Sequence, residues 1–316
     1  VPVSADTHAA SAFAVEGAAR RGRLMRAATY ASVGVAVLLI AAKLVAWVYT
    51  GSVAMLTSLV DSLLDGAASV TTLVAVRHAL VPADDEHRFG HGKAEALAGL
   101  AQGAFITGSV AFLLFESGQR LIEPHPVTHG ATGVAVMILS IAATFSLLLF
   151  QRFVVRRTGS IAVIADSLHY KTDLLTNLGV IAALLLAAEG KWAVADPLVA
   201  IAIALYVLKG AFGIFREAFD HLMDREFPDE MRARIRDIVM QHPEARSIHD
   251  LRTRWSGNRP FIQFHLEMDG AMTLLRAHHI SDEIEQAVMR EFPGAEVMIH
   301  EDPEGVEGIS PGAARS

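Results

Sequence analysis

The sequence predicts an α-helical membrane protein with six transmembrane helices, followed by a small α+β cytoplasmic domain with the element order αββαβ. Two observations support this fold class. Of the 316 residues, 52% are hydrophobic and only 19% are charged, and the apolar residues are gathered into long runs. After about residue 225 the composition becomes polar, with alternating apolar patterns such as FIQFHLEM that are typical of strands in a water-soluble domain.

Six apolar segments are long enough to cross a bilayer, which takes roughly 20 mainly apolar residues in a helix. They cover about 28–50, 53–80, 94–120, 130–152, 161–188 and 192–217. We therefore expect a transmembrane domain over 25–222 and a disordered cytoplasmic segment over 1–24. The first residues lack a basic start and an apolar core, so no cleaved signal peptide is expected.

Basic residues gather before the first expected span and in the connection after the fourth. By the positive-inside rule, the N-terminus, the second and fourth connections and the C-terminal domain should be cytoplasmic, which agrees with an even number of spans. The residues are Arg20, Arg21, Arg23, Arg26, Arg152, Arg156 and Arg157.

The polar C-terminal part, over 223–302, shows a regular order of elements. We expect helices over about 229–241 and 273–292 and strands over about 248–255, 260–268 and 295–300, which together form a small sheet covered by helices on one face. The last residues, 303–316, are expected to be a disordered tail. The net charge of -7 is spread along the chain without a basic stripe, so no nucleic-acid partner is expected.

Two pairs of ionisable residues lie inside the expected second and fifth spans. Asp61 and Asp65 in SLVDSLLD, and His169 and Asp173 in LHYKTD, are each four residues apart and so share one helix face. Such groups are costly inside a membrane and usually face a bundle interior or an ion path. Three carboxylates and one imidazole form a tetrahedral set suited to Zn²⁺ and tolerable for Cd²⁺, Fe²⁺ or Co²⁺. The alternative is that they only join helices by hydrogen bonds; Asp166 is treated as a flanking charge.

A second group lies in the connection PADDEHRFGHGK. Asp84, His87 and His91 supply one carboxylate and two imidazoles at spacings of three and four residues, within reach of one ion if the loop forms a helical turn. The alternative is a polar loop whose charges are simply solvated. Because the chain has no cysteine, any metal ligand must be histidine or carboxylate.

Several long motifs resemble the cation diffusion facilitator family, in particular its bacterial zinc and ferrous-iron efflux members. These motifs are SLVDSLLD, PADDEHRFGHGKAEALA, ADSLHYKTD, HDLRTRWSG and FIQFHLEMD, and the resemblance covers about 25–302. It implies a homodimer that exchanges a divalent metal ion for protons across a lipid bilayer. It also implies that Asp61, Asp65, His169 and Asp173 form the transport site and that the loop binds a second metal.

Further roles follow from the resemblance alone. It implies a binuclear zinc site at the dimer interface, although each of these histidines taken singly is typical of a surface or core position. It also implies an interlock between Lys93 and Asp224 and a hydrophobic gate at Leu168. The residues assigned to the zinc site are His249, His265, His278, His300 and Asp302.

The expected function is therefore a divalent cation:proton antiporter, and not an enzyme, that exports Zn²⁺, and also Cd²⁺ or Fe²⁺, by alternating access. Zn²⁺ is expected both as the transported and as a structural ion, with no organic cofactor. Metal binding requires deprotonated ligands, and His169 is the natural proton carrier because the unperturbed pKa of histidine is about 6.5. The alternative is a membrane metal sensor without transport.

Overall fold

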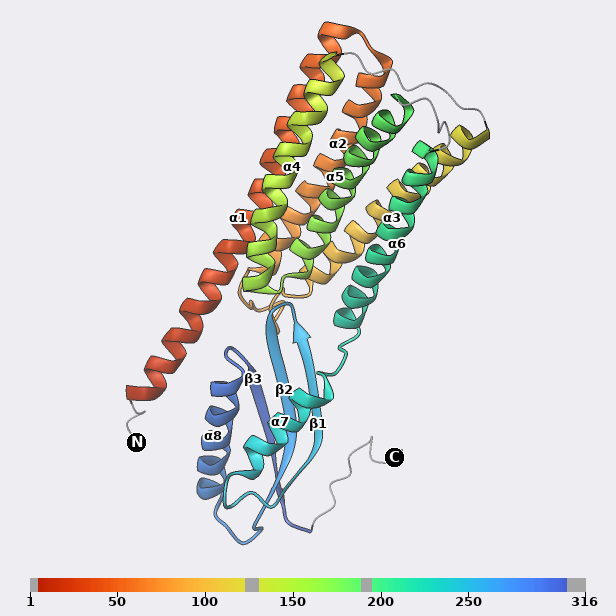
Figure 1. Ribbon diagram of the computed structural model, residues 1–316. Helices are drawn as coiled ribbons and strands as arrows, with labels where there is room; N and C mark the ends of the chain where they lie inside the picture. The colour runs from red at the N-terminus through yellow and green to blue at the C-terminus, as the bar shows by residue number, and fades with distance from the viewer. Residues whose placement is uncertain (1–4, 123–130, 189–194, 306–316) are drawn as a thin grey trace. The chain divides into compact units, whose positions relative to one another are not determined.

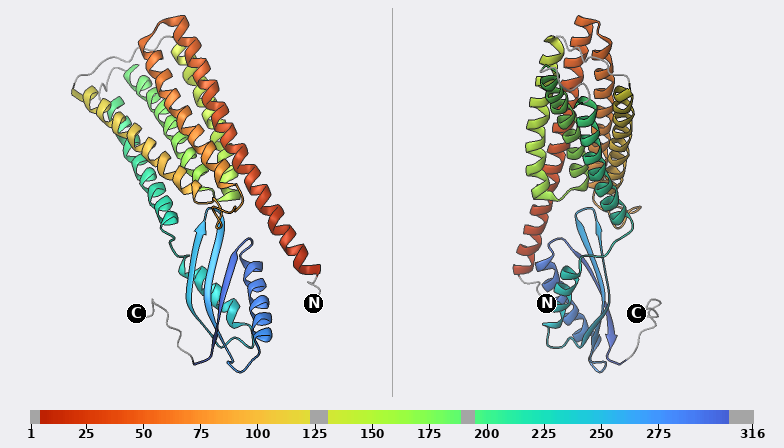
Figure 2. Two further views of the ribbon diagram at one scale, coloured as in Figure 1. Left: turned by 180° about the vertical axis from the view of Figure 1, so that it is seen from behind. Right: turned by 45° about the vertical axis from the view of Figure 1, so that its right-hand side comes forward.

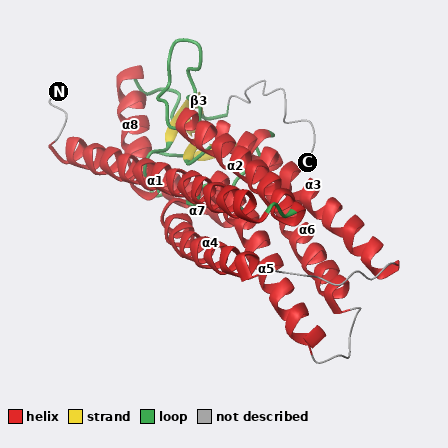
Figure 3. Ribbon diagram, turned by 90° about the horizontal axis from the view of Figure 1, so that it is seen from above, coloured by secondary structure: helices red, strands yellow, loops and turns green. Residues whose placement is uncertain are grey.

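The computed structural model describes residues 5–122, 131–188 and 195–305, which form two compact units. One unit, over Arg21–Phe219, is a bundle of long helices (Figures 1 and 3). The other contains Val1–Arg20 and Asp220–Ser316 and holds an α+β domain. The tail expected over 303–316 lies almost wholly outside the described residues.

Six helices match the six expected spans (Figure 1). Within the described residues, α1, α2, α3, α4 and α6 are long and apolar enough to cross a membrane. In α5, the run of apolar residues is interrupted in its first half by Asp166, Lys171 and Asp173, although the helix itself is continuous. The helices are α1 (Ala5–Thr50), α2 (Val53–Ala79), α3 (Ala94–Ile122), α4 (Ala131–Thr158), α5 (Ile161–Ala188) and α6 (Ala195–Leu222).

The first helix is longer than expected. It begins at Ala5, so the segment that was predicted to be disordered over 1–24 is helical from residue 5 onward. This segment is rich in alanine and arginine, which are strong helix formers, and it lacks proline after residue 2. Its low hydrophobicity therefore marks where the apolar span begins and not where the helix begins.

Helix α5 lies at the centre of the bundle's packing. It contacts α2, α3 and α4, and α2 also packs against α3. Small residues allow close approach: a Cβ at Gly99 of α3 would lie 3.0 Å from Ile161 Cγ2 of α5. A Cβ at Gly210 of α6 would lie 2.9 Å from a methyl of Leu168. Such small-residue crossings are typical of helices packed in membranes.

A buried polar network centred on Asp166 holds α5 in place. Asp166 is 1% exposed, and its Oδ2 accepts hydrogen bonds from Ser32 Oγ of α1 at 2.5 Å and from Gln151 Nε2 of α4 at 2.7 Å. Gln102 Nε2 of α3 approaches its Oδ1 at 3.5 Å. Asp166 is thus no mere flanking charge. It joins four helices three residues before His169.

The α+β domain has the expected αββαβ order, with α7 (Asp229–Met240), β1 (Ser247–Ser256), β2 (Arg259–Met268), α8 (Leu274–Glu291) and β3 (Glu296–Pro303). The sheet order is β1-β2-β3, with β1 and β2 antiparallel and β2 and β3 parallel. Both helices cover the same face of the sheet (Figure 2). The predicted fold class is therefore confirmed.

The core of this domain lies between the sheet and its two helices. Alternate β2 residues, including Ile262, Phe264 and Leu266, pack against Ile280 and Ile284 of α8. Side chains alternate between the two faces of a strand, so the odd-numbered residues of β2 lie on the opposite face of the sheet. That face presents the histidines described below.

Candidate metal sites

The first site joins α2 and α5 inside the bundle. His169 Nε2 lies 3.0 Å from Asp65 Oδ1 and 4.0 Å from Asp173 Oδ2, and the ligand atoms of all three residues lie within 4.8 Å of one another. The side chain of His169 is 5% exposed, against 17% for Asp65 and 30% for Asp173. Two carboxylates and one imidazole therefore converge in an apolar setting, where a divalent cation would neutralise them.

The other two residues expected here lie at the edge of this group. Asp61 is exposed in the isolated chain and lies outside the converging set, although it is one helical turn before Asp65 on α2. Leu168 lies beside His169 and packs into the apolar cluster between α3 and α6 that contains Ile106 and Val207. The site thus has polar ligands on one side and a hydrophobic residue directly beside them.

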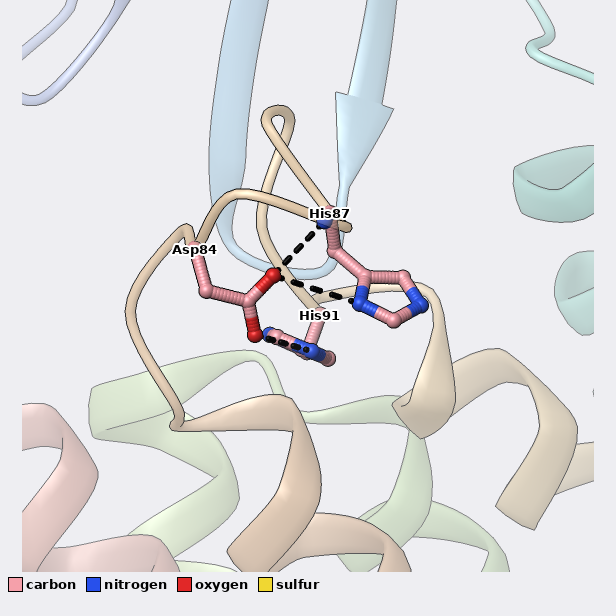
Figure 4. A group of neighbouring side chains, drawn as sticks. All are labelled: Asp84, His87 and His91. Carbon is pink, nitrogen blue, oxygen red and sulfur yellow. Dashed lines mark hydrogen bonds and ion pairs between the residues drawn. The ribbon is translucent and has the colours of Figure 1, made fainter.

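The second site lies in the connection between α2 and α3, where Asp84, His87 and His91 converge (Figure 4). Asp84 Oδ1 lies 3.3 Å from His87 Nδ1, and Asp84 Oδ2 lies 3.4 Å from His91 Nε2. The backbone N–H of His87 donates to Asp84 Oδ1 at 2.6 Å and lowers the pKa of that carboxyl below its ordinary value. The carboxylate of Asp84 thus faces both imidazoles, one with each oxygen.

The third site lies on the open face of the sheet, where His249, His265 and His300 form a row across β1, β2 and β3. The carboxylate of Asp302 lies among them. Its Oδ2 is 2.8 Å from His265 Nδ1 and 3.3 Å from His249 Nε2, and its Oδ1 is 3.4 Å from His300 Nε2. Strand register thus brings four of the five expected ligands together.

His278, the fifth expected ligand, does not join this group within one chain. It lies on α8, on the helical side of the domain, and its Nε2 is 3.6 Å from Asp282 Oδ2. Its side chain is 65% exposed, so it is accessible to a second molecule. Any shared role with the row of histidines requires another copy of the chain.

Two carboxylates beside the third site were not foreseen from the sequence. Glu267 Oε1 lies 3.5 Å from His249 Nδ1, and Asp250 Oδ2 lies 3.8 Å from His265 Nε2. Asp250 adopts a positive φ of 46° where the register of β1 shifts between His249 and Arg252. The alternation of side chains along β2 could have placed Glu267 on this face, but nothing in the sequence marks the bulge that places Asp250 there.

The interlock expected between Lys93 and Asp224 would involve one residue from each of the two units. Lys93 lies just before α3 in the bundle, and Asp224 follows α6 in the other unit. Within its own unit, Asp224 Oδ1 lies 3.5 Å from Arg254. A pairing of Lys93 with Asp224 stays a prediction.

Comparison with known families matches both parts of the chain. A model of the cation efflux transmembrane domain matches residues 29–223, and a model of the cytoplasmic domain of cation efflux proteins matches residues 227–304. The chain belongs to the cation efflux, or cation diffusion facilitator, family. The resemblance inferred from the sequence motifs is thereby confirmed.

Members of this family include relatives that match nearly the whole chain. Cation-efflux pump FieF of Escherichia coli strain K12 / DH10B is 50% identical over 282 residues, which cover 89% of this chain and 94% of the relative. FieF of strain O139:H28 (E24377A / ETEC) matches equally well. This cation diffusion facilitator is therefore a multi-pass membrane transporter for metal cation efflux, and not an enzyme.

Two solved structures of related proteins match a smaller part of the chain. The zinc form of CzrB is 38% identical and covers 27% of this chain and 98% of its own, with a TM-score of 0.26. The metal-bound C-terminal domain of the CzcD transporter from Thermotoga maritima is 28% identical and covers 25% of this chain and 93% of its own, with a TM-score of 0.24.

Proposed function

We propose that this protein is a homodimeric antiporter that exports Zn²⁺ from the cytoplasm in exchange for protons. The observation that carries this proposal is the convergence of Asp65, His169 and Asp173 within 4.8 Å of one another between α2 and α5. Nitrogen and oxygen ligands of this kind suit Zn²⁺, and also Cd²⁺ and Fe²⁺. A hard ion such as Mg²⁺ would prefer six oxygen ligands.

The geometry supports exchange between metal and proton at the same atoms. His169 Nε2 and Asp65 Oδ1 lie at hydrogen-bond distance, 3.0 Å, so a proton on the imidazole nitrogen bridges them when no metal is bound. A metal ion needs the lone pair of that nitrogen and both carboxylates in their charged form. Metal entry therefore releases protons, and protons arriving from the opposite side release the metal.

Asp61 supplies the fourth ligand of the proposed site. It precedes Asp65 by one turn of α2, so a modest rotation of α2 against α5 would add its carboxylate to the two carboxylates and one imidazole that already converge. The same movement exposes the site alternately to the two sides of the membrane. Leu168, packed between α3 and α6, is positioned to close one side.

The cytoplasmic domain is proposed to bind zinc where two protomers meet. Three imidazoles and Asp302 form a donor set that fits Zn²⁺, and Asp302 already lies within 3.4 Å of a nitrogen of each. The exposed His278 on α8 would contribute a further imidazole from the second protomer. Metal binding there would stabilise the dimer by mass action. We place the dimer in a bacterial inner membrane with both termini cytoplasmic.

The proposal is tested by zinc uptake into inverted membrane vesicles that have an acidic lumen. Asp173→Asn keeps the size of the side chain but removes the charge that binds the metal, so uptake should fall to the level of vesicles without the protein. Glu217→Gln, which neutralises an exposed carboxylate of α6, is the matched control and should transport normally. Normal uptake by Asp173→Asn would contradict the proposed site and favour a metal receptor.

A further inference from the structure

We propose that His78, in the last turn of α2, is a fourth protein ligand of the metal site formed by Asp84, His87 and His91. With four protein ligands the site is closed and fixes the end of α2. The proposal rests on the loop being a metal site, which the convergence of Asp84, His87 and His91 supports. All four residues belong to the bundle unit. The ligand class is a tetrahedral, borderline-soft divalent cation such as Zn²⁺ or Cd²⁺.

The environment of His91 points to a missing partner. Its side chain is only 4% exposed, and its Nε2 faces Asp84 Oδ2 at 3.4 Å. Its other nitrogen, Nδ1, is buried and has no hydrogen-bond partner in the described structure. A buried polar nitrogen without a partner is costly, which indicates that an atom or ion belongs beside this ring.

Two further imidazoles contact the ring of His91. The ring of His87 lies 4.5 Å from it, centroid to centroid, and the ring of His78 lies 4.6 Å from it at an interplanar angle of 73°. Zn–N bonds of about 2.0–2.1 Å at a tetrahedral angle put the centroids of two coordinating imidazoles about 5 Å apart. The ring of His78 therefore lies about as close to His91 as the ring of His87 does, although its nitrogens are not among the ligand atoms that lie within 4.8 Å of one another and would have to turn to join them.

His78 is free to complete the site by turning its side chain. It is exposed and lies one residue before the end of α2, so a change of rotamer costs little packing. Asp84, His87 and His91 supply three ligands, which leaves one of four tetrahedral positions open. A protonated histidine in the last turn of a helix interacts favourably with the helix dipole. This interaction does not account for the contact of His78 with the buried ring of His91.

A fourth protein ligand changes the role of the loop metal. Four protein ligands form a closed site, which holds its ion, whereas three ligands and an open position suit exchange. His78 lies 13 residues after Asp65 on the same helix, or about 20 Å along its axis. A metal ion in the loop would connect the end of α2 to the start of α3. It would therefore regulate the movement of α2, and it would not be an intermediate on the transport path.

The first test measures Zn²⁺ binding to the purified full-length protein by competition with a chelator. The loop site is the component that is lost in Asp84→Ala. His78→Gln should weaken this component by roughly tenfold or more, as expected for a lost contact to a metal site, and should have no further effect when combined with Asp84→Ala. Arg77→Gln, one residue away, is the matched control and should bind as the wild type. Wild-type affinity in His78→Gln would overturn the proposal.

The second test uses the absence of cysteine from the chain. In His78→Cys, Cd²⁺ added stepwise until all metal sites of the chain are filled should produce a thiolate-to-cadmium charge-transfer absorption. The same absorption should be missing in Arg77→Cys, which points about 100° away around the helix, and in His78→Cys combined with His91→Ala. No absorption in His78→Cys, or equal absorption in Arg77→Cys, would overturn the proposal. Neither test depends on transport, so failure of the antiport proposal is seen separately.

Discussion

At the scale of single residues, the proposed transport site depends on a shared proton. His169 is almost fully buried and lies within hydrogen-bond distance of Asp65, while Asp173 lies slightly farther away. A buried charge is tolerated only when it is paired, so an empty site needs the proton and a filled site needs the metal. In the proposed exchange, the same three side chains would determine both which ion binds and what replaces it.

The choice of metal should depend on the imidazole. His169→Asp replaces a nitrogen ligand with a carboxylate and should admit Mn²⁺, which prefers oxygen, while weakening the preference for Zn²⁺. Competition between the two ions for uptake into vesicles measures this change. If the order of preference stays the same as in the wild type, His169 does not select the metal.

Spacing along the sequence predicted these ligands only as pairs. Four-residue spacing puts Asp61 and Asp65 on the same face of α2, yet only Asp65 converges with α5 and Asp61 is exposed. The difference arises from how α2 packs against α5. Residue spacing shows which side chains share a helix face, but it does not show how that face packs against another helix. For the same reason Asp166 was taken for a flanking charge, although helices α1, α3 and α4 bury it.

At the scale of elements, helix α5 is fixed at its beginning as well as at Asp166. Glu95 of α3 is 4% exposed, and its Oε2 accepts a hydrogen bond from Ser160 Oγ at 2.5 Å. Its carboxylate also lies beside the backbone N–H groups of Ile161 and Ala162, the first residues of α5. A carboxylate at a helix N-terminus satisfies free N–H groups and favours the dipole.

Loss of this contact should destabilise the bundle. Glu95→Ala leaves the first N–H groups of α5 buried without a partner, which should cost about 1–3 kcal/mol and lower the melting temperature in detergent. Glu95→Gln, which still accepts hydrogen bonds, should be affected less. Equal melting temperatures for the wild type and Glu95→Ala would show that α5 does not need this cap.

The sequence predicted the types of most elements but not their ends or irregularities. Alternating apolar residues marked β1 and β2, and their pairing then aligns His249 with His265. The bulge at Asp250 could not be predicted, because an aspartate with positive φ follows no pattern along the strand. The start of α1 was missed because hydrophobicity reports the membrane-crossing part of a helix and not its full length.

At the scale of the whole molecule, the chain combines a membrane bundle with a domain that gathers histidines on one open face. The donor set around Asp302 is formed by three strands, so it exists only when the sheet is folded. In the proposed dimer, metal bound there would stabilise the folded and assembled state in preference to the unfolded one. The cytoplasmic domain would then have a means of responding to the metal.

The cytoplasmic site can be separated from the transport site. His265→Ala removes the imidazole nearest to Asp302 and should lower the number of metal ions bound per chain, with the transport site still occupied. Elemental analysis of the purified protein measures this number, and light scattering should show a weaker dimer after chelation. His242→Ala is the control, since His242 pairs with Glu283 away from the row. Unchanged stoichiometry in His265→Ala would exclude this site.

The central claim, that metal and protons exchange at one site within the membrane, is tested most directly by proton movement in proteoliposomes. Zn²⁺ is added outside, a pH-sensitive dye is enclosed, and wild type, Asp65→Ala and Glu217→Gln are compared. The wild type and Glu217→Gln should show Zn²⁺-dependent proton movement that is absent in Asp65→Ala. Equal signals from Asp65→Ala and the wild type would mean that the carboxylates inside the membrane only hold helices together.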